Sequence, residues 1–358
     1  MKSEQVRHWS EEKRLADYVH HHFGFTIKKA KPIRGILKLT SDLGCFVLKK
    51  ATANEKDLWR MIADLAVHLG LRFPMPAPVP TKTGQLTFDG FHHKYVLLPW
   101  IQAGSLSLDC KQDWIQITQH LANLHQYSQS FQTHPYRKLQ KMGKWFADWK
   151  HAYRQLELFY LAAKWADRKT KTDRSWLKVA HYSLGIMENL LRYFDKIKGD
   201  QCCLESAEKG KVCHGNLHPH NMLRDEKKQI YFIDWNQAVF DVRTRDLAQW
   251  LLYAYYRTKS PELLISLLKA YQQVSPLLEA EYALLYARFL YPERLIGVLR
   301  DIYEDQTLPI TAGAPSILFA SKVEEQKLGL LNSYPELIQK EFGVTIPTID
   351  WINLTSCQ

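Results

Sequence analysis

One short stretch constrains this chain more than any other. Residues 214–221 read His-Gly-Asn-Leu-His-Pro-His-Asn, and Ile-Asp-Trp follows at residues 233–235. Asn221 and Asp234 carry the amide and carboxylate oxygens that bind a hard cation such as Mg²⁺. The stretch therefore predicts a magnesium site, built from one loop and from the end of the strand that follows it.

The spacing of this stretch is that of a phosphoryl-transfer loop. In ATP-dependent phosphotransferases an Asp accepts the proton of the substrate hydroxyl, and an Asn five residues later and an Asp after the next strand hold the metal. Here the base position is Asn216. A carboxamide cannot act as a base near pH 7, and losing a general base costs roughly 10²–10⁴-fold in rate. We therefore expect a kinase-like fold in which nucleotide binding is favoured over turnover.

Hydrophobic patterning predicts a bilobed α+β protein-kinase-like fold. The N-lobe, residues 1–99, should hold a small antiparallel sheet, and residues 100–105 a hinge. Residues 106–358 should form a mainly helical C-lobe that carries the degenerate loop. The strands expected in the N-lobe are Thr26–Ala30, Gly35–Thr40, Cys45–Lys49, Gln85–Phe88 and Lys94–Leu98, with helices near Glu11–Phe23 and Glu55–Leu71. In the C-lobe we expect strands at Lys211–Cys213 and Gln229–Ile233 and helices that include Arg243–Tyr256, Glu262–Gln272, Glu281–Leu290 and Pro292–Tyr303.

Two charged residues of the N-lobe complete the candidate nucleotide site. Lys49 ends a strand, where a kinase-fold lysine would reach the phosphates of ATP, although an ordinary surface lysine fits the pattern too. Glu55 begins the next helix. It is either the ion-pair partner of Lys49 or a first-turn acid that favours the helix dipole. Only Gly35 and Gly44 lie near the first hairpin, so the backbone that would cover the phosphates is poor in glycine.

Composition limits the compartment and the cofactors. No run of about 18 apolar residues occurs, which argues against a membrane span, and the polar N-terminus argues against a signal peptide. The six cysteines show no metal-ligand spacing, so no zinc is expected and synthesis in a reducing cytoplasm is favoured. The cysteines are Cys45, Cys110, Cys202, Cys203, Cys213 and Cys357.

The net charge of +11 is concentrated in one segment. Residues 137–178 contain 12 Lys/Arg against 4 Asp/Glu and four tryptophans. Four large residues recur there near helical spacing (Trp145, Trp149, Leu156 and Tyr160), as on the buried face of an amphipathic helix with a solvated basic face. The alternative is an electrostatic docking surface for an acidic protein, polymer or membrane. Nucleic acid is not the expected partner.

The motifs together resemble the aminoglycoside and choline kinase superfamily. Its loop reads His-Gly-Asp-Leu-His-Pro-Gly-Asn, and residues 214–221 match six of the eight positions, with Asn216 and His220 as the departures. The resemblance implies that His214 is a scaffold residue that hydrogen-bonds the backbone. The segment Arg243-Thr-Arg-Asp-Leu-Ala is similar to the superfamily's Arg-x-x-Asp-Leu-Ala, which implies that Asp246 caps a helix and braces the catalytic loop.

More narrowly, the chain resembles spore-coat-associated kinase-like proteins of the CotS type, in particular a YsxE-like branch. The similarity lies in the His-Gly-Asn loop, in Phe46-Val-Leu-Lys-Lys and in Phe289-Leu-Tyr-Pro-Glu. It implies a coat component with other coat proteins as partners, made in the mother cell, with a structural or assembly role and possible residual binding of ATP and Mg²⁺. Two alternatives stay open, namely an active small-molecule kinase and a basic protein- or polymer-binding module.

Overall fold

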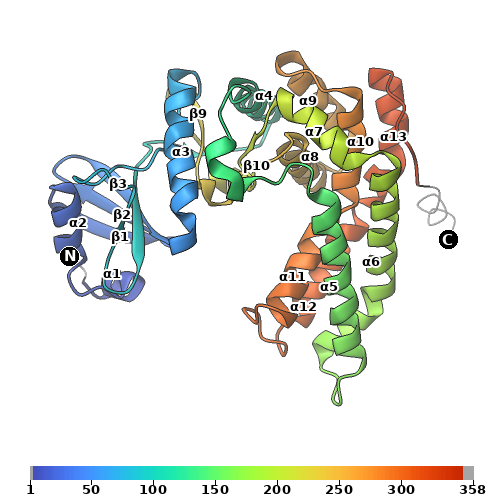
Figure 1. The fold of residues 1–358 in the computed structure, drawn as a ribbon, viewed down its shortest axis with the longest axis horizontal. Coiled ribbons are helices and arrows are strands. Elements are labelled where there is room, and N and C mark those ends of the chain that lie inside the picture. The colour runs from blue at the N-terminus through green and yellow to red at the C-terminus, as the bar shows by residue number, and fades with distance from the viewer. Residues whose placement is uncertain (1–2, 350–358) are drawn as a thin grey trace. The chain divides into compact units, whose positions relative to one another are not determined.

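The computed structural model describes residues 3–349, which form two compact units (Figure 1). The first unit combines three separate pieces of chain, residues 3–107, 127–140 and 214–239, and the remaining described residues form the second. The units are therefore interleaved along the sequence, whereas patterning suggested one cut near residue 100. Loop 214–221 belongs to the same unit as the N-terminal sheet.

A five-stranded antiparallel sheet is the framework of the first unit. The spatial order of its strands is β1-β2-β3-β5-β4, and consecutive pairs are antiparallel. All five lie close to the predicted positions. In β2 burial alternates along the strand, with Leu37 and Leu39 buried, whereas β5 has four consecutive buried residues. The strands are β1 (Ile27–Ile33), β2 (Ile36–Ser41), β3 (Cys45–Ala51), β4 (Thr87–Asp89) and β5 (Lys94–Pro99).

Three helices accompany this sheet. The predicted helix Glu11–Phe23 is shorter than expected, because Glu11 has a φ of 61° and separates α1 (Ser3–Ser10) from α2 (Leu15–Phe23). Val6, Leu15 and Val19 from these helices share one buried cluster with strand residues of the sheet. α3 (Lys56–Leu69) follows β3, as the sequence predicted.

A second, smaller sheet carries the loop of interest. Its order is β6-β8-β9, formed by Gly104–Ser105, Met222–Arg224 and Ile230–Phe232. Gly104 pairs with Arg224, so the predicted hinge segment contributes an edge strand. Single-turn helices precede β8 and follow β9, at Pro219–Asn221 and Trp235–Gln237. Two further short strands, β7 (Val212–Cys213) and β10 (Val239–Phe240), lie at chain positions where one unit gives way to the other.

The second unit is helical. Four of its helices form a ring in which α5 packs against α6, α6 against α12, α12 against α11, and α11 against α5 (Figure 1). The helices are α4 (Lys111–Tyr127, whose last residue falls in the first unit), α5 (Trp145–Lys164), α6 (Lys171–Lys196), α7 (Gly199–Ser206), α8 (Thr244–Thr258), α9 (Pro261–Val274), α10 (Glu279–Leu290), α11 (Glu293–Tyr303), α12 (Ala314–Glu325) and α13 (Leu328–Phe342). None of the helices within residues 3–349 is long and apolar enough to cross a membrane.

Specific polar contacts join these helices. At the start of α6, Thr170 and Asp173 form a reciprocal capping box, and the Tyr303 hydroxyl of α11 donates to Asp173 over 2.9 Å. Next to α8, the fully buried Arg243 guanidinium donates to both carboxylate oxygens of Glu281 in α10, at 2.8 and 2.7 Å. The five described cysteines are free thiols, and Cys357 lies outside the described residues.

Candidate functional site

The β8–β9 hairpin brings the two predicted metal ligands to neighbouring positions. Met222 pairs with Phe232, and one step further the N–H of Ile233 donates to the carbonyl of Asn221 over 2.9 Å. Asp234 is the next residue. Asn221 is buried, and its Nδ2 donates to the Asn216 carbonyl at 3.0 Å. Because the amide nitrogen is used in this way, Oδ1 is the atom of Asn221 that could bind a cation.

Lys49 reaches the same place from the large sheet. It lies in β3 opposite Val96, and its Nζ donates to Asp234 Oδ1 and, over 2.9 Å, to Asn236 Oδ1. The Lys49 side chain is 12% exposed and that of Asp234 is 40% exposed, so this ion pair is partly shielded from solvent. Asp234 has φ 66° and ψ 59°, a left-handed conformation that is uncommon for a residue with a side chain. Lysine, carboxylate and amide thus meet at one point.

Asn236 is a member of this group that the sequence did not reveal. Its only signal is its place two residues after Asp234, and residues with this spacing do not predictably face the same way in a turn. The turn Trp235–Gln237 directs it back toward Lys49.

Glu55, for which an ion pair with Lys49 was one of two interpretations, is the N-cap residue of α3 and does not pair with that lysine. Its Oε2 accepts a hydrogen bond from Trp59 Nε1, one turn along the same helix, at 3.1 Å. The acid paired with Lys49 is Asp234 instead. Asp57, the other nearby acid, lies 4.0 Å from Lys138.

His214 ties the start of the loop to the strand end. Its Nε2 lies 2.9 Å from the Ile233 carbonyl, and the N–H of Asn216 donates to its Nδ1 at 3.3 Å. Since Nδ1 accepts, Nε2 is the donor, and both ring nitrogens are bound to backbone groups. The ring is buried and its centroid lies 4.7 Å from that of Trp235. The imidazole thus links the start of the loop to the end of β9.

Two further histidines lie within the loop. His218 is half-buried and His220 is exposed, and their ring centroids are 5.8 Å apart. Burial and the neighbouring His220 lower the pKa of His218, with Asp234 acting in the opposite direction. The neutral form of His218 is therefore favoured near pH 7.

The first hairpin has no glycine-rich loop. Ile33 pairs with Ile36, which leaves a two-residue turn of Arg34 (φ 42°) and Gly35 (φ 84°). Positive φ at both central residues is typical of the tightest β-hairpin turns. Trp9 Nε1 of α1 donates to the Gly35 carbonyl over 3.1 Å and holds the turn in place. The turn offers few free backbone N–H groups to a phosphate.

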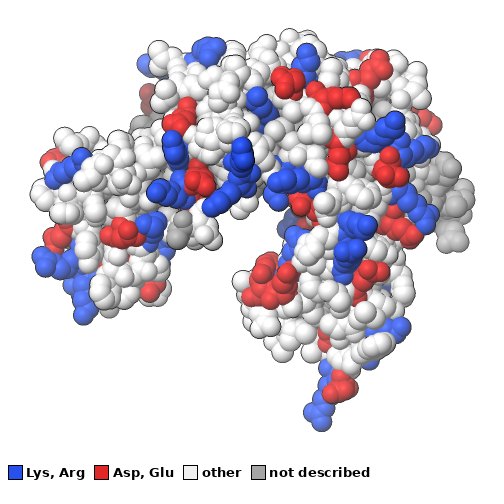
Figure 2. Space-filling view, viewed as in Figure 1, with Lys and Arg blue, Asp and Glu red and all other residues white. Residues whose placement is uncertain are grey.

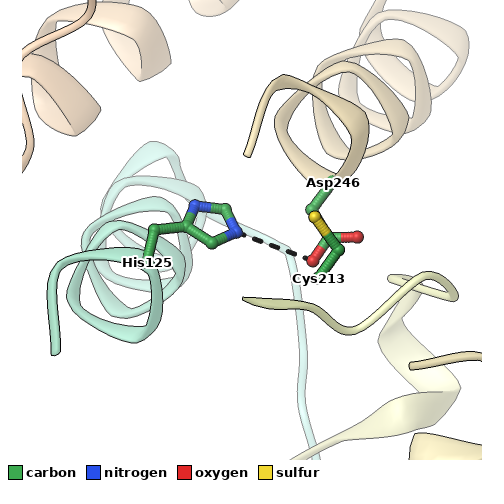
Figure 3. Close-up of side chains that lie close together, drawn as sticks. All are labelled: His125, Cys213 and Asp246. Carbon is green, nitrogen blue, oxygen red and sulfur yellow. Dashed lines mark ion pairs between the residues drawn. The ribbon is translucent and has the colours of Figure 1, made fainter. Parts of the chain in front are cut away.

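Asp246 lies in the second unit, in a buried cluster with His125 and Cys213 (Figure 3). Asp246 is the third residue of α8. The N-cap position is held by Arg243, which makes no capping hydrogen bond through its side chain. The expectation that Asp246 is the cap of this helix is therefore wrong. All three side chains are fully buried, and His125 Nε2 lies 3.6 Å from Asp246 Oδ2. On the other side, His125 Nδ1 lies 2.7 Å from the Tyr271 hydroxyl.

The potential ligand atoms of this cluster all lie within 4.8 Å of one another, which raises the question of a metal ion. Zinc would require the Cys213 thiolate. Burial, and then the carboxylates of Asp246 and Asp241, raise the pKa of Cys213 well above its usual range. The thiol instead lies 3.5 and 3.4 Å from two backbone carbonyls, to which it donates. In this structure the thiol is thus engaged as a hydrogen-bond donor to the backbone.

Comparison with protein families decides the relationship. The family model described as "Spore coat putative kinase YutH" matches residues 16–311. This chain belongs to that family. The match confirms the resemblance to coat-associated kinase-like proteins, and it names the YutH family where the motifs had pointed to a YsxE-like branch.

Two curated relatives of this YutH-family chain come from Bacillus subtilis (strain 168). Endospore coat-associated protein YutH is 26% identical over 227 residues, which cover 62% of this chain and 63% of the relative, so the match spans less than two thirds of that protein. Spore coat protein S is 22% identical over 333 residues, or 91% of this chain and 94% of the relative.

Solved structures confirm the fold. An aminoglycoside phosphotransferase from Alicyclobacillus acidocaldarius has a TM-score of 0.68 at 16% identity, covering 88% of this chain and 93% of that one. Spectinomycin phosphotransferase APH(9)-Ia, in complex with ADP and spectinomycin, has a TM-score of 0.60 at 18% identity, with 88% and 93% covered. This member of the YutH family therefore has an aminoglycoside phosphotransferase-like fold.

Proposed function

We propose that this chain is a spore-coat-associated kinase-like protein that binds Mg²⁺–ATP and transfers phosphate slowly or not at all. Membership of the YutH family, and relatives named as coat proteins, support the coat location and an assembly role among other coat proteins. A fold shared with a phosphotransferase solved with ADP supports nucleotide binding.

The residues present fit a metal–nucleotide complex. Asp234 and Asn221 would hold the cation through oxygen atoms, and the ammonium of Lys49 would face the phosphates. When bound, Mg²⁺–ATP would supply the phosphoryl group and neutralise its charge. In the structure Lys49 itself balances the charge of Asp234, which supports a role for Asp234 in holding a positive partner.

The observation that carries the proposal is Asn216 in the same unit as Lys49, Asn221 and Asp234. Its carbonyl accepts from Asn221 and its N–H donates to His214, so its backbone is fixed where a catalytic loop would present a base. Its carboxamide can orient a hydroxyl but cannot remove the proton. The protein keeps the means of binding and lacks the usual base.

Calorimetric titration of ATP, with and without Mg²⁺, tests the binding. We expect Mg²⁺-dependent binding to the unmodified protein and at least about tenfold weaker binding to Asp234→Ala, a loss of about 1.4 kcal/mol. Asp89→Ala is the matched control, since Asp89 is an exposed acid on β4 that pairs with Lys94. Absence of binding at millimolar nucleotide would leave the fold as a scaffold and refute this part of the proposal.

Restoring the carboxylate tests the catalytic part. With Asn216→Asp we expect phosphate release from ATP to increase by about 10²–10⁴-fold over the unmodified protein. A turnover of about 1–100 s⁻¹ by the unmodified protein, as in ordinary kinases, would contradict the proposal. It would favour the alternative that the gathering of Lys49, Asn221 and Asp234 also supports, an active kinase for a small hydroxylated substrate.

A further inference from the structure

Helix α5 carries an apolar seam on its solvent side. Leu158 is 63% exposed, Leu161 is 40% exposed and Trp165, the residue after the helix, is 75% exposed. Their spacing of three and then four residues places them within about 60° on the helix surface. The opposite side of α5 is buried in the four-helix ring, as Phe159 stacking on Tyr303 shows.

The exposure of Trp165 distinguishes this seam from the buried stripe of an ordinary amphipathic helix. Of the four tryptophans in segment 137–178, Trp145, Trp149 and Trp176 are at most 2% exposed. The amphipathic-helix interpretation of the segment is therefore right for these three. It does not account for Trp165, or for the two leucines that lie in line with it.

Basic side chains outnumber acidic ones around the seam. Arg154 precedes it by one turn, Lys164 lies beside it with its ammonium 5.3 Å from the Tyr160 ring, and Arg168 follows Trp165; all three are exposed. Between Arg154 and Lys178 there are seven Lys/Arg and three Asp/Glu. Of the three acids, Asp173 is buried and used by the capping box, whereas Glu157 and Asp167 are exposed, so exposed basic residues outnumber exposed acids in this segment. Figure 2 shows basic side chains, together with acidic ones, at the end of the α5–α6 hairpin.

We propose that this seam binds an amphipathic helix of a partner protein whose apolar stripe is bordered by Asp and Glu. A three–four repeat of apolar residues is the pattern by which one α-helix packs along another, and flanking charges of opposite sign select the partner. The inference goes beyond the proposed function, because the seam lies in the second unit and uses none of the nucleotide-site residues.

The width and charge of the seam argue against other occupants. A helix that lies on a membrane needs a broad apolar face, whereas this one is a single file of three side chains. A second copy of the same seam would bring a surface of net positive charge against its own equivalent, since the seven Lys/Arg of residues 154–178 outnumber the exposed Glu157 and Asp167, and such like charges are unfavourable. A helix with acidic borders satisfies both the apolar and the charged groups.

Two designed peptides test this directly on the full-length protein. Both are three-heptad helices with Leu at the seam positions, one with Glu and one with Lys at the bordering positions. Binding is followed by fluorescence anisotropy of the labelled peptide. We expect the Glu-bordered peptide to bind at least about tenfold more tightly than the Lys-bordered peptide, and the difference to shrink with added salt.

Paired variants locate the binding. Leu158→Ser with Leu161→Ser, and separately Arg154→Glu with Lys164→Glu, should each weaken binding of the Glu-bordered peptide by at least about tenfold. The controls are Leu71→Ser, a fully exposed leucine of the first unit, and Lys28→Glu with Lys29→Glu, two exposed lysines of β1. The controls should bind as the unmodified protein does, and thermal unfolding of every variant verifies its fold.

Four results would overturn the proposal. The first two are no binding of the Glu-bordered peptide at about 100 μM and equal binding of both peptides. The third is a loss of peptide affinity in the control variants as large as in the seam variants. The fourth is seam-dependent binding to phosphatidylglycerol vesicles in place of the peptide. Self-association that the seam variants abolish, measured by sedimentation, would assign the surface to a second copy of the chain instead.

Discussion

At the scale of single residues, Gly215 shows how tightly the loop is built. It has a φ of 77°, and a Cβ added there would lie 2.2 Å from the carbonyl oxygen of Gln237. The loop therefore approaches the turn after Asp234 as closely as backbone atoms allow. Any side chain at this position would push the loop away from the groups that meet at Asp234.

We expect Gly215→Ala to lower the free energy of unfolding by about 2–4 kcal/mol, because it combines a backbone clash with an unfavourable φ. Gly185→Ala is the matched control. Gly185 lies inside α6 with open space around its Cα, so the same change should stabilise the protein by about 0.5–1 kcal/mol. Urea unfolding of both variants checks the pair. A neutral Gly215→Ala would show that the loop can move aside.

Glu12 gives the protein a predictable dependence on pH. Its buried carboxylate accepts a hydrogen bond from the N–H of His92 over 2.9 Å, and the Tyr95 hydroxyl lies 3.4 Å away. Burial alone would raise the pKa of Glu12, but the backbone N–H groups of residues 91–93 lower it, and the pKa falls below the usual 4.5. Stability from this contact is complete above pH 4.5 and is lost as the pH falls through the lower pKa of the folded state.

The substitution Glu12→Gln should therefore reduce the dependence of the free energy of unfolding on pH at acid pH. Between about pH 5 and pH 3 the unmodified protein should lose more unfolding free energy than the variant, since the variant no longer binds a proton there on unfolding. Denaturant unfolding at several pH values checks this, with the exposed turn residue changed in Glu226→Gln as the control. Parallel curves for the unmodified protein and Glu12→Gln would contradict the assignment.

At the scale of elements, one buried ion pair joins α8 to α10. Besides its two bonds to Glu281, Arg243 donates to the hydroxyl of Ser275 and to the carbonyl of Pro276. With the Ser275 carbonyl, which Nη1 reaches over 3.4 Å, five acceptor atoms surround one guanidinium that is 1% exposed. A buried charge is tolerated when it is fully paired, and it is costly when its partner is removed.

We expect Arg243→Met to cost about 3–5 kcal/mol, because it leaves the Glu281 carboxylate buried without its partner. The double change Arg243→Met with Glu281→Met should recover most of that loss, since it removes both charges together. The recovery is the coupling measured by a double-mutant cycle of unfolding free energies. If the two losses simply added, Arg243 and Glu281 would not act as a pair.

The elements themselves were largely predictable from sequence. β2, β3, β5 and α8 to α11 follow from local patterns of apolar residues, which the fold respects because one side of each element is buried. The break at Glu11 was missed, because its left-handed backbone has no apolar signal.

The candidate site was predictable only in part. Asn221 and Asp234 follow from a motif, whereas the partner of Lys49 depends on which chain segments meet in space. Glu55 was the nearest acid in sequence, yet Asp234, 185 residues away from Lys49, holds the ion pair. The cluster of His125, Cys213 and Asp246 was missed for the same reason, since its members are scattered along the chain.

At the scale of the whole molecule, the division into two units predicts which elements a bound ligand should stabilise. The groups proposed to hold Mg²⁺–ATP, Lys49, Asn221 and Asp234, all lie in the first unit. A ligand that binds only the folded state raises the opening free energy of the elements it contacts.

Hydrogen exchange followed by mass spectrometry can test this. With saturating Mg²⁺–ATP we expect slower exchange in β3 and in residues 214–239, and little change in α5 and α6 of the second unit. Asp234→Ala should abolish the protection. Protection confined to the second unit would place the nucleotide elsewhere.

The interleaving of the first unit also bears on how the protein is made. The ribosome synthesises the sheet of residues 27–99 early. It synthesises the hairpin that supplies Asn221 and Asp234 only after helices α4 to α7, which belong almost entirely to the second unit. The ion pair between Lys49 and Asp234 can therefore form only after a further 185 residues have been synthesised. During that interval the nascent sheet lacks part of its own unit. This is the stage of synthesis at which the incomplete unit is most exposed to aggregation, and at which a chaperone would be most useful.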